Sequence, residues 1–255
     1  MAIFILAAVF APLITRYSYS EADMTMILQK PSAQHWFWTD HLGRDLFSRV
    51  VYGGRISLMV GLISVGIGVL FGCTIGAISA YQGGKFDLYI MRVLDIFQSI
   101  PAMLLAIAIS AILGNGIVNC MIAVGITSIP RFARVTRAAV MTIKECEYVE
   151  AARSVGEKSW KIILVHLLPN SLAPIIVQAS LSMAAGILAC ASLSFLGLGV
   201  VPPTPEWGSI LSEARGYLYQ ALYYVLFPGI AIVLCIISMN LIGDGLRDAL
   251  DPRLK

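Results

Sequence analysis

The chain has 255 residues, of which 58% are apolar and 13% are charged, and its mean hydropathy is +0.82. Soluble domains of this length carry about 25% charged residues, so the composition excludes an ordinary soluble domain. The net charge of +3 gives no indication of nucleic-acid binding, and the basic residues are better interpreted by the side of the membrane on which they lie.

Asp, Glu, Lys and Arg are absent from residues 96–130, 162–205 and 216–243. A helix needs about 20 apolar residues to cross a hydrocarbon core of roughly 30 Å. The sequence therefore predicts an all-α, polytopic membrane protein with about six transmembrane helices.

The first 14 residues are wholly apolar and would extend about 21 Å as a helix, which is short for a full crossing. A signal peptide is an alternative, but no Lys or Arg precedes Arg16 and no small-residue cleavage site is evident. We expect a first transmembrane helix with a short inner start. Together with a polar, aromatic outer segment it makes up residues 1–54, and residues 55–255 form the main transmembrane domain.

A second span is expected at residues 56–81. Small residues recur in it at every fourth position, namely Ser64, Gly68, Gly72, Gly76 and Ala80. This spacing puts a smooth stripe on one helix face, where another helix backbone can approach closely. The stripe suits helix packing within the chain and a subunit interface equally well.

A surface segment with Asp87, Arg92 and Asp95 precedes the next apolar run. Gly114-Asn115-Gly116 is a turn signal that divides this run into span three, about 99–113, and span four, about 117–134. Basic residues then follow at three-residue spacing, as Arg131, Arg134 and Arg137. We expect span four to continue out of the membrane as a helix with a basic face.

Span five is expected at 171–197 and span six at 223–242, joined by an exposed, proline-rich connection. With the N-terminus inside, the inner segments are 81–95, 131–161 and 247–255. They hold 12 of the 18 Lys and Arg residues. This distribution agrees with the positive-inside rule.

Residues 150–170, EAARSVGEKSWKIILVHLLPN, form a charged insert between apolar spans. Gly156 permits the backbone conformation that ends a helix, and Ser159 can cap a second helix that starts near Trp160. The pattern predicts a helix, a sharp turn and a second helix on the inner membrane surface. An amphipathic helix resting on lipid headgroups would explain the Lys, Arg and Trp residues, but not this spacing of alanines, glycine and Leu-Pro.

This insert resembles the EAA loop of ATP-binding cassette (ABC) importer permeases. The matching residues are Glu150, Ala151, Ala152, Gly156, Leu168 and Pro169. His166 stands where many members have Ile, as is common in the peptide-importing branch. Residues 38–58, 194–211 and 240–253 also resemble segments of the dipeptide, oligopeptide and nickel permeases, with Trp38 where a glycine is usual.

The resemblance implies a type I ABC importer permease fold and the role of the second permease subunit. Such a subunit forms half of the translocation pore for peptides or a nickel complex. Its partners would be a homologous permease in a heterodimer, two ATP-binding subunits and an extracytoplasmic solute-binding protein. ATP and Mg²⁺ would bind to the ATPase subunits and no cofactor to this chain, which would reside in a bacterial or archaeal cytoplasmic membrane.

The resemblance also implies a cytoplasmic coupling loop at about 138–170, in which the six matching residues contact the ATPase. Four charged residues, Asp40, Arg44, Asp45 and Arg49, would shape the outer surface by a local salt-bridged fold or by contact with the binding protein. Another four, Ser192, Ser194, Gly197 and Gly199, are candidates for an outer gate or for helix-end packing.

No catalytic or metal site is expected. His35 and His41 have a poor ligand spacing without other donors. The five cysteines, Cys73, Cys120, Cys146, Cys190 and Cys235, fit small buried hydrophobes, and nothing demands a disulfide.

The main alternative is a secondary transporter or channel not driven by ATP. Such proteins carry ionisable residues within their spans, and these spans are nearly free of them. An exporter usually has a fused nucleotide-binding domain, and a membrane enzyme needs a catalytic constellation. Neither feature is evident in the sequence.

Overall fold

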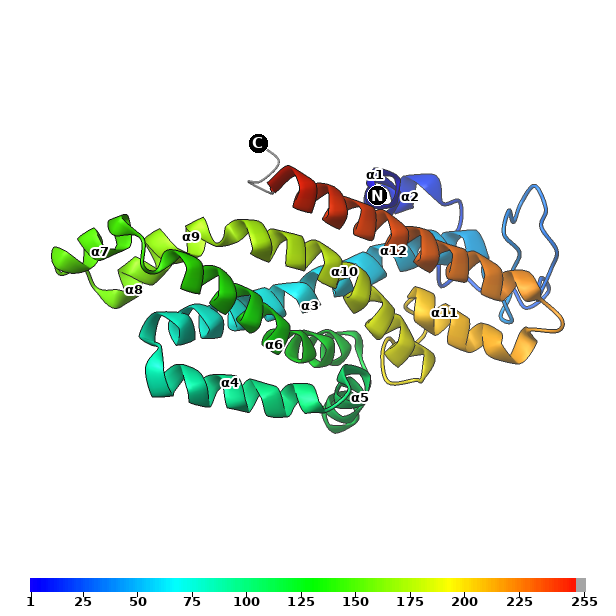
Figure 1. Ribbon diagram of the computed structural model, residues 1–255. Coiled ribbons are helices and arrows are strands. Elements are labelled where there is room, and N and C mark those ends of the chain that lie inside the picture. The colour runs from blue at the N-terminus through cyan, green and yellow to red at the C-terminus, as the bar shows by residue number, and fades with distance from the viewer. Residues whose placement is uncertain (251–255) are drawn as a thin grey trace.

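The protein is an elongated assembly of helices (Figure 1). The computed structural model describes residues 1–250, and this range contains helices and loops but no strand. The six longest helices are α3 (Leu46–Gln82), α4 (Gly84–Ser99), α5 (Ala102–Leu113), α6 (Ile117–Ile143), α10 (Leu172–Phe195) and α12 (Leu222–Leu250). The short elements are α1 (Ala2–Val9), α2 (Ala11–Ile14), α7 (Glu147–Ser154), α8 (Ser159–Lys161), the π-helix η1 (Ile162–Leu167), α9 (Leu168–Asn170), α11 (Trp207–Ala214) and the 3₁₀-helix η2 (Arg215–Tyr217).

Helices α3 and α6 pack along much of their length through the small-residue stripe. A Cβ added at Gly68 would lie 2.1 Å from Ser128 Oγ, and one added at Gly76 would lie 2.2 Å from the carbonyl oxygen of Ala133. At Gly72 the added atom would meet Phe132 Cβ at 2.6 Å. The stripe therefore faces α6 of the same chain, because only glycine allows the two backbones to come so close.

Three helices, α3, α10 and α12, are long and apolar enough to cross a membrane, or up to four if the bent pair α4–α5 is one span. Helix α6 has 27 residues and is about 40 Å long, and it runs beyond the expected end of span four into the basic face. The number of about six spans stays a prediction.

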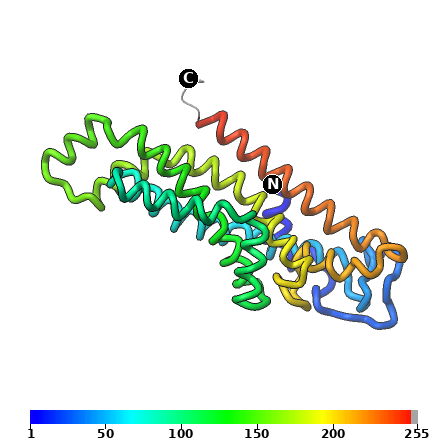
Figure 2. Tube along the Cα trace, turned by 60° about the horizontal axis from the view of Figure 1, so that its bottom comes forward, coloured from blue at the N-terminus to red at the C-terminus, as the bar shows by residue number. Residues whose placement is uncertain are grey.

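The expected third span differs from the structure. Its residues form α5, whose 12 residues extend about 18 Å, too short to cross alone. A sharp break at Ile100-Pro101 separates α5 from α4, and the two helices meet at 87°. The break arises because Pro101 keeps the preceding Ile100 out of the helical region, at φ −89° and ψ 129°. Figure 2 shows α5 turned across the end of α4.

The N-terminal segment is also not a single helix. It divides into α1 and α2 at Phe10, and Pro12 occupies the first turn of α2. Helix α1 packs on α3, and the ring of Phe4 meets that of Trp207 edge-on, with centroids 6.0 Å apart. Helix α1 therefore packs against α3 and contacts the first residue of α11.

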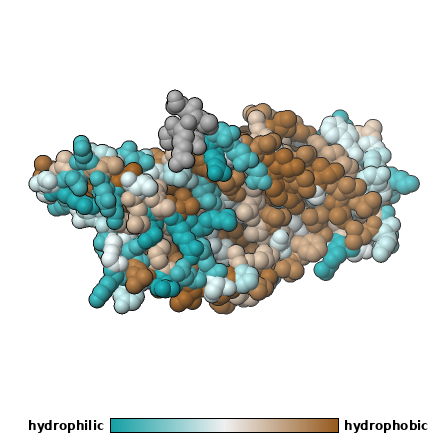
Figure 3. Space-filling model, viewed as in Figure 1, coloured by the Kyte–Doolittle hydropathy of each residue, from teal (hydrophilic) through white to brown (hydrophobic). Residues whose placement is uncertain are grey.

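The two ends of the molecule differ in character. Helices α7, α8 and α9 form one end, and α11 with the long loop before α3 forms the other (Figures 1 and 2). Hydrophilic residues extend from the α7–α8 end over the adjoining part of the molecule, whereas hydrophobic residues gather on the face between there and the α11 end (Figure 3). This distribution suits a molecule with its middle in lipid.

The structure brings two of the five cysteines together. Cys120 of α6 and Cys190 of α10 form a disulfide, with their Cα atoms 6.3 Å apart. Their separation of 70 residues hides this proximity, which arises only when α6 and α10 pack together. Cys73 and Cys235 are buried and Cys146 is half-buried, all three as free thiols.

Candidate functional site

A groove with a volume of about 680 Å³ opens between α3, the α4–α5 bend, α6 and α10. Its wall is mainly apolar, with the polar residues Ser64, Gln98, Thr127, Ser128, Arg131, Ser182 and Ser192. Small-molecule sites occupy about 300–1,000 Å³ and combine apolar walls with a few polar groups, so the groove can hold a small solute. The bend at Pro101 contributes to this wall, which gives the broken helix a structural role.

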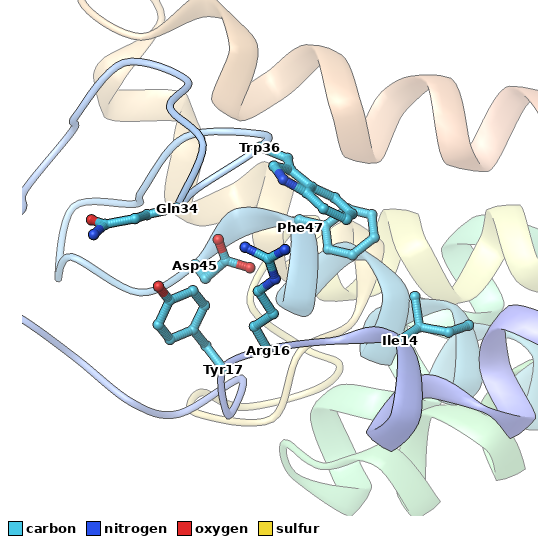
Figure 4. Close-up of a pocket in the computed structure, with 7 residues that line it drawn as sticks. All are labelled: Ile14, Arg16, Tyr17, Gln34, Trp36, Asp45 and Phe47. Carbon is cyan, nitrogen blue, oxygen red and sulfur yellow. The ribbon is translucent and has the colours of Figure 1, made fainter.

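A second hollow lies in the outer segment and is far smaller, with a volume of about 10 Å³. Arg16, Tyr17, Gln34 and Asp45 supply its polar lining, and Trp36 and Phe47 lie beside them (Figure 4). This volume is close to that of one water position, so the hollow cannot hold a solute.

The predicted coupling loop, residues 138–170, is called the coupling segment below, and it contains α7, which is anchored to the rest of the chain by its buried face. Val149 and Ala152 lie in an apolar cluster with Ala80, Val140 and Ile162. Glu150 and Ala151 lie on the opposite, exposed face. The predicted docking alanines therefore divide, since Ala152 packs inside this chain and Ala151 is open to a partner.

The turn after α7 is built on Gly156. Its φ of +77° is a conformation that glycine adopts without strain, and a Cβ there would meet nothing within 4 Å. The N–H of Glu157 donates to the carbonyl of Ala152 at 3.0 Å, which closes the C-terminal turn of α7.

Glu157 ties this turn to the following helix. Its carboxylate lies 2.6 Å from Lys161 Nζ and 2.8 Å from His166 Nε2. The hydrogen bonds from Lys161 and then His166 hold the pKa of Glu157 below its usual value. The contact gives His166 a structural role, because it ties η1 to the residue that follows Gly156.

Residues 159–170 form one continuous helical run, and Ser159 is not its cap. The N-cap is Lys158, without a side-chain hydrogen bond, and Ser159 is the first helical residue. The run contains a π turn in which Leu168 N donates to Ile163 O. Pro169 follows directly and cannot donate a backbone hydrogen bond, which favours this departure from α-helical bonding. Leu168 is half-buried and Pro169 is exposed.

Sequence reasoning missed the apolar side chains that the coupling segment exposes. Val155 is 83% exposed, Trp160 60% and Tyr148 43%. They lie on both sides of the Gly156 turn, at the end of the molecule. Their apolar character was a visible signal, but a sequence alone does not show which apolar residues face inward.

The long loop before α3 and helix α11 share a buried ion-pair network. Asp40 pairs with Arg44 and Arg49, and both guanidinium groups also reach Glu213 of α11. Burial raises the pKa of Glu213, but Arg49 and Arg44 outweigh it and lower that pKa below its ordinary value. Sequence reasoning assigned no role to Glu213, because it lies 164 residues from Arg49.

Asp45 has a separate task at the start of α3. It is the N-cap, with Oδ2 accepting from Ser48 N at 2.8 Å, and its Oδ1 contacts His35 Nδ1 at 2.9 Å.

Ligand atoms of Asp40, His41 and Glu213 lie within 4.8 Å of one another. Two arginines already neutralise these carboxylates, so the group is an ion-pair cluster with little attraction for a cation.

The four residues predicted for an outer gate occupy two different places in the structure. Ser194 is buried and accepts from Val200 N at 3.1 Å, Gly197 has a φ of +83°, and a Cβ on Gly199 would lie 2.1 Å from Ser194 Oγ. These three build the tight C-terminal end of α10. Ser192 alone lines the groove, with its hydroxyl donating to Leu188 O at 2.8 Å.

Comparisons with known proteins agree with this architecture. The family model described as "Binding-protein-dependent transport system inner membrane component" matches residues 68–255. The chain is 51% identical over 252 residues to the dipeptide transport system permease protein DppC of Alkalihalophilus pseudofirmus, covering 99% of this chain and 83% of that protein. It is 47% identical over 233 residues to the glutathione transport system permease protein GsiD of Pectobacterium atrosepticum, covering 91% and 77%.

Among solved structures, an inward-facing structure of the MetNI methionine ABC transporter aligns with a TM-score of 0.64. It covers 81% of this chain and 98% of that chain at 19% identity, so this likeness concerns the fold. The helical architecture is that of an ABC importer permease in a multi-pass membrane protein. The chain belongs to the family of binding-protein-dependent transport system inner membrane components, and it is a permease subunit of an ABC importer.

Proposed function

We propose that the chain forms half of the pore through which a bacterial ABC importer moves short peptides across the cytoplasmic membrane. The 680 Å³ groove carries the proposal, because it is large enough for a small peptide and combines apolar walls with hydroxyl groups. Dipeptide and glutathione transport, the functions for which the two relatives are named, favour peptide cargo over a nickel complex. A homologous permease would supply the other half of the pore.

The proposed energy source is a pair of ATP-binding partner subunits, which would hold ATP and Mg²⁺ while this chain binds no cofactor. Glu150, Ala151 and the exposed Val155 and Trp160 would contact such a subunit. Gly156 and the Glu157 contacts would hold this surface in shape. Closure of the ATPase pair would move the coupling segments together and switch the permeases between two packed states. An extracytoplasmic binding protein would deliver the solute to the opposite end.

The test uses the assembled transporter in proteoliposomes, with its binding protein outside and ATP inside. We expect uptake of Ala-Ala and stimulation of ATP hydrolysis when the binding protein carries this dipeptide. If ATP hydrolysis were stimulated only by a binding protein that carries a nickel chelate, the cargo would be a nickel complex and not a peptide. Solute uptake that proceeds equally without ATP would contradict the proposal and favour a channel or secondary transporter.

A further inference from the structure

Arg131 brings a charge into the groove. Among the described residues that line this groove, it is the only one with a formal charge, and it is exposed. The other polar lining groups are hydroxyls and one amide. The electrostatic character of the groove therefore depends on a single guanidinium group.

The neighbouring arginines of α6 are neutralised, whereas Arg131 is not. Arg134 forms an ion pair with Asp95, and Arg137 forms one with Asp87, both on α4. Within residues 1–250 the structure shows no ion pair for Arg131. Arg134 and Arg137 thus join α6 to α4 by ion pairs, whereas the charge of Arg131 is available to a ligand.

Arg131 lies about 21 Å along α6 from Ile117, at the start of the basic face of this helix. Its side chain lines the groove, one helical turn before Arg134. A charged side chain beside a water-filled cavity of a membrane protein marks a solute pathway more often than a lipid contact.

Two hydroxyl groups stand one turn away on the same helix. Thr127 Oγ1 donates to Val124 O at 2.8 Å, and Ser128 Oγ donates to Gly125 O at 2.7 Å. Because each hydrogen is used in this way, the oxygen lone pairs remain as acceptors. The groove thus offers one cation for an anion and nearby acceptors for N–H groups, which matches a solute with a carboxylate and amide or ammonium groups.

We propose that Arg131 binds the terminal carboxylate of the solute during its passage through the groove and thereby selects carboxylate-bearing cargo. A guanidinium group suits this task because it can donate two parallel hydrogen bonds to a carboxylate. This inference rests on the proposed function, and it adds a residue of the permease itself to the determinants of specificity. A lipid phosphate is the other anion that Arg131 could meet, and the experiment separates the two.

The experiment compares Arg131→Gln, Arg131→Lys and Arg134→Gln with the wild type in the assembled, reconstituted transporter. Uptake is measured for Ala-Ala and for its C-terminal amide, each at a concentration that saturates the binding protein. We expect Arg131→Gln to lower Ala-Ala uptake about tenfold and amide uptake less than about twofold, since one charge-assisted hydrogen-bonded contact is lost. Arg131→Lys should retain most Ala-Ala uptake, and Arg134→Gln should leave the ratio of the two uptakes unchanged.

Stimulation of ATP hydrolysis by the loaded binding protein should persist in Arg131→Gln, which separates a solute contact from a structural defect. Equal losses for Ala-Ala and its amide would overturn the inference and indicate a lipid phosphate or a purely structural role. Unchanged Ala-Ala uptake in Arg131→Gln would also overturn it. Absence of ATP-driven uptake in the wild type would instead refute the proposed function.

Discussion

Arg49 of α3 and Glu213 of α11 form a two-point ion pair, with Nη1–Oε2 and Nη2–Oε1 distances of 2.7 and 2.9 Å. The Arg49 side chain is fully buried, and Asp40 contacts the same guanidinium group. The pair joins the first long span to the connection between the last two spans. The free energy that the pair contributes therefore affects how the α11 end of the molecule is held together.

Replacing Glu213 with Gln should lower stability markedly. Arg49 would remain buried with one carboxylate fewer, and breaking a buried pair costs about 3–5 kcal/mol. We expect a clear fall in Tm of the purified chain in lipid nanodiscs. Glu145→Gln is the matched control, because Glu145 is exposed at the opposite end of the molecule and should leave Tm unchanged. An equal Tm for wild type and Glu213→Gln would show that the pair contributes no net stability.

Two outer carboxyl groups should respond to pH with opposite signs. The pKa of Glu213 is lowered in the folded state, so its stabilisation is present above its unfolded pKa and is lost as pH falls through the folded pKa. Burial raises the pKa of Glu206, so its charged form destabilises the fold as pH rises above its unfolded pKa. On acidification, the Tm advantage of wild type over Glu213→Gln should shrink, whereas Tm relative to Glu206→Gln should rise. Parallel trends in both comparisons would contradict this assignment.

Gly76→Ala should disrupt the contact between α3 and α6. The new methyl group would lie 2.2 Å from the Ala133 carbonyl oxygen, so a backbone must move, and overpacking of this kind costs about 1–3 kcal/mol. Gly66→Ala is the control, since the same methyl group on the same helix meets nothing within 4 Å. Thermal unfolding in nanodiscs should show a lower Tm for the Gly76 variant alone. Identical Tm values for the two variants would show that α3 and α6 accommodate the added methyl group without loss of stability.

Gly156→Val and Glu150→Lys should uncouple ATP hydrolysis from uptake in the assembled transporter. The first variant places a β-branched residue at φ +77°, and the second reverses a charge on the exposed face of α7. Both chains should still insert into the membrane and assemble, because these positions lack buried contacts. The paired assay is uptake per ATP hydrolysed, with Glu145→Lys as an exposed charge-reversal control. Wild-type transport in both variants would remove the coupling segment from the proposed mechanism.

The sequence predicted the large-scale features because they depend on local composition. Apolar runs located α10 and α12, the glycine spacing located a helix contact, and the turn at Gly156 followed from its neighbours. The break at Pro101 was also visible in principle, since proline restricts the residue before it. It was overlooked because the apolar run continues through it.

Features that depend on long-range packing could not be predicted in this way. The residues around Arg49 in the sequence do not indicate that Glu213 is its ion-pair partner. Likewise, the residues around Cys120 do not indicate that it pairs with Cys190. Trp38 is an intermediate case, because the family resemblance leads to an expectation of glycine at this position and the φ of Trp38 is +92°. The sequence marked the unusual backbone, but only the structure shows the indole ring stacked on Tyr223 at a centroid distance of 5.1 Å.

The π turn in the last part of the coupling segment has a consequence for the orientation of that segment relative to α10. A turn closed by Leu168 N and Ile163 O contains one residue more than an α-helical turn, and each residue of an α-helix advances by about 100° around the axis. The additional residue therefore sets the rotational angle between the surface near Trp160 and the groove-facing side of α10. Deleting one residue from this run would restore α-helical bonding but would turn the surface proposed to contact an ATPase in another direction, although Trp160 and the residues of α10 would be unchanged.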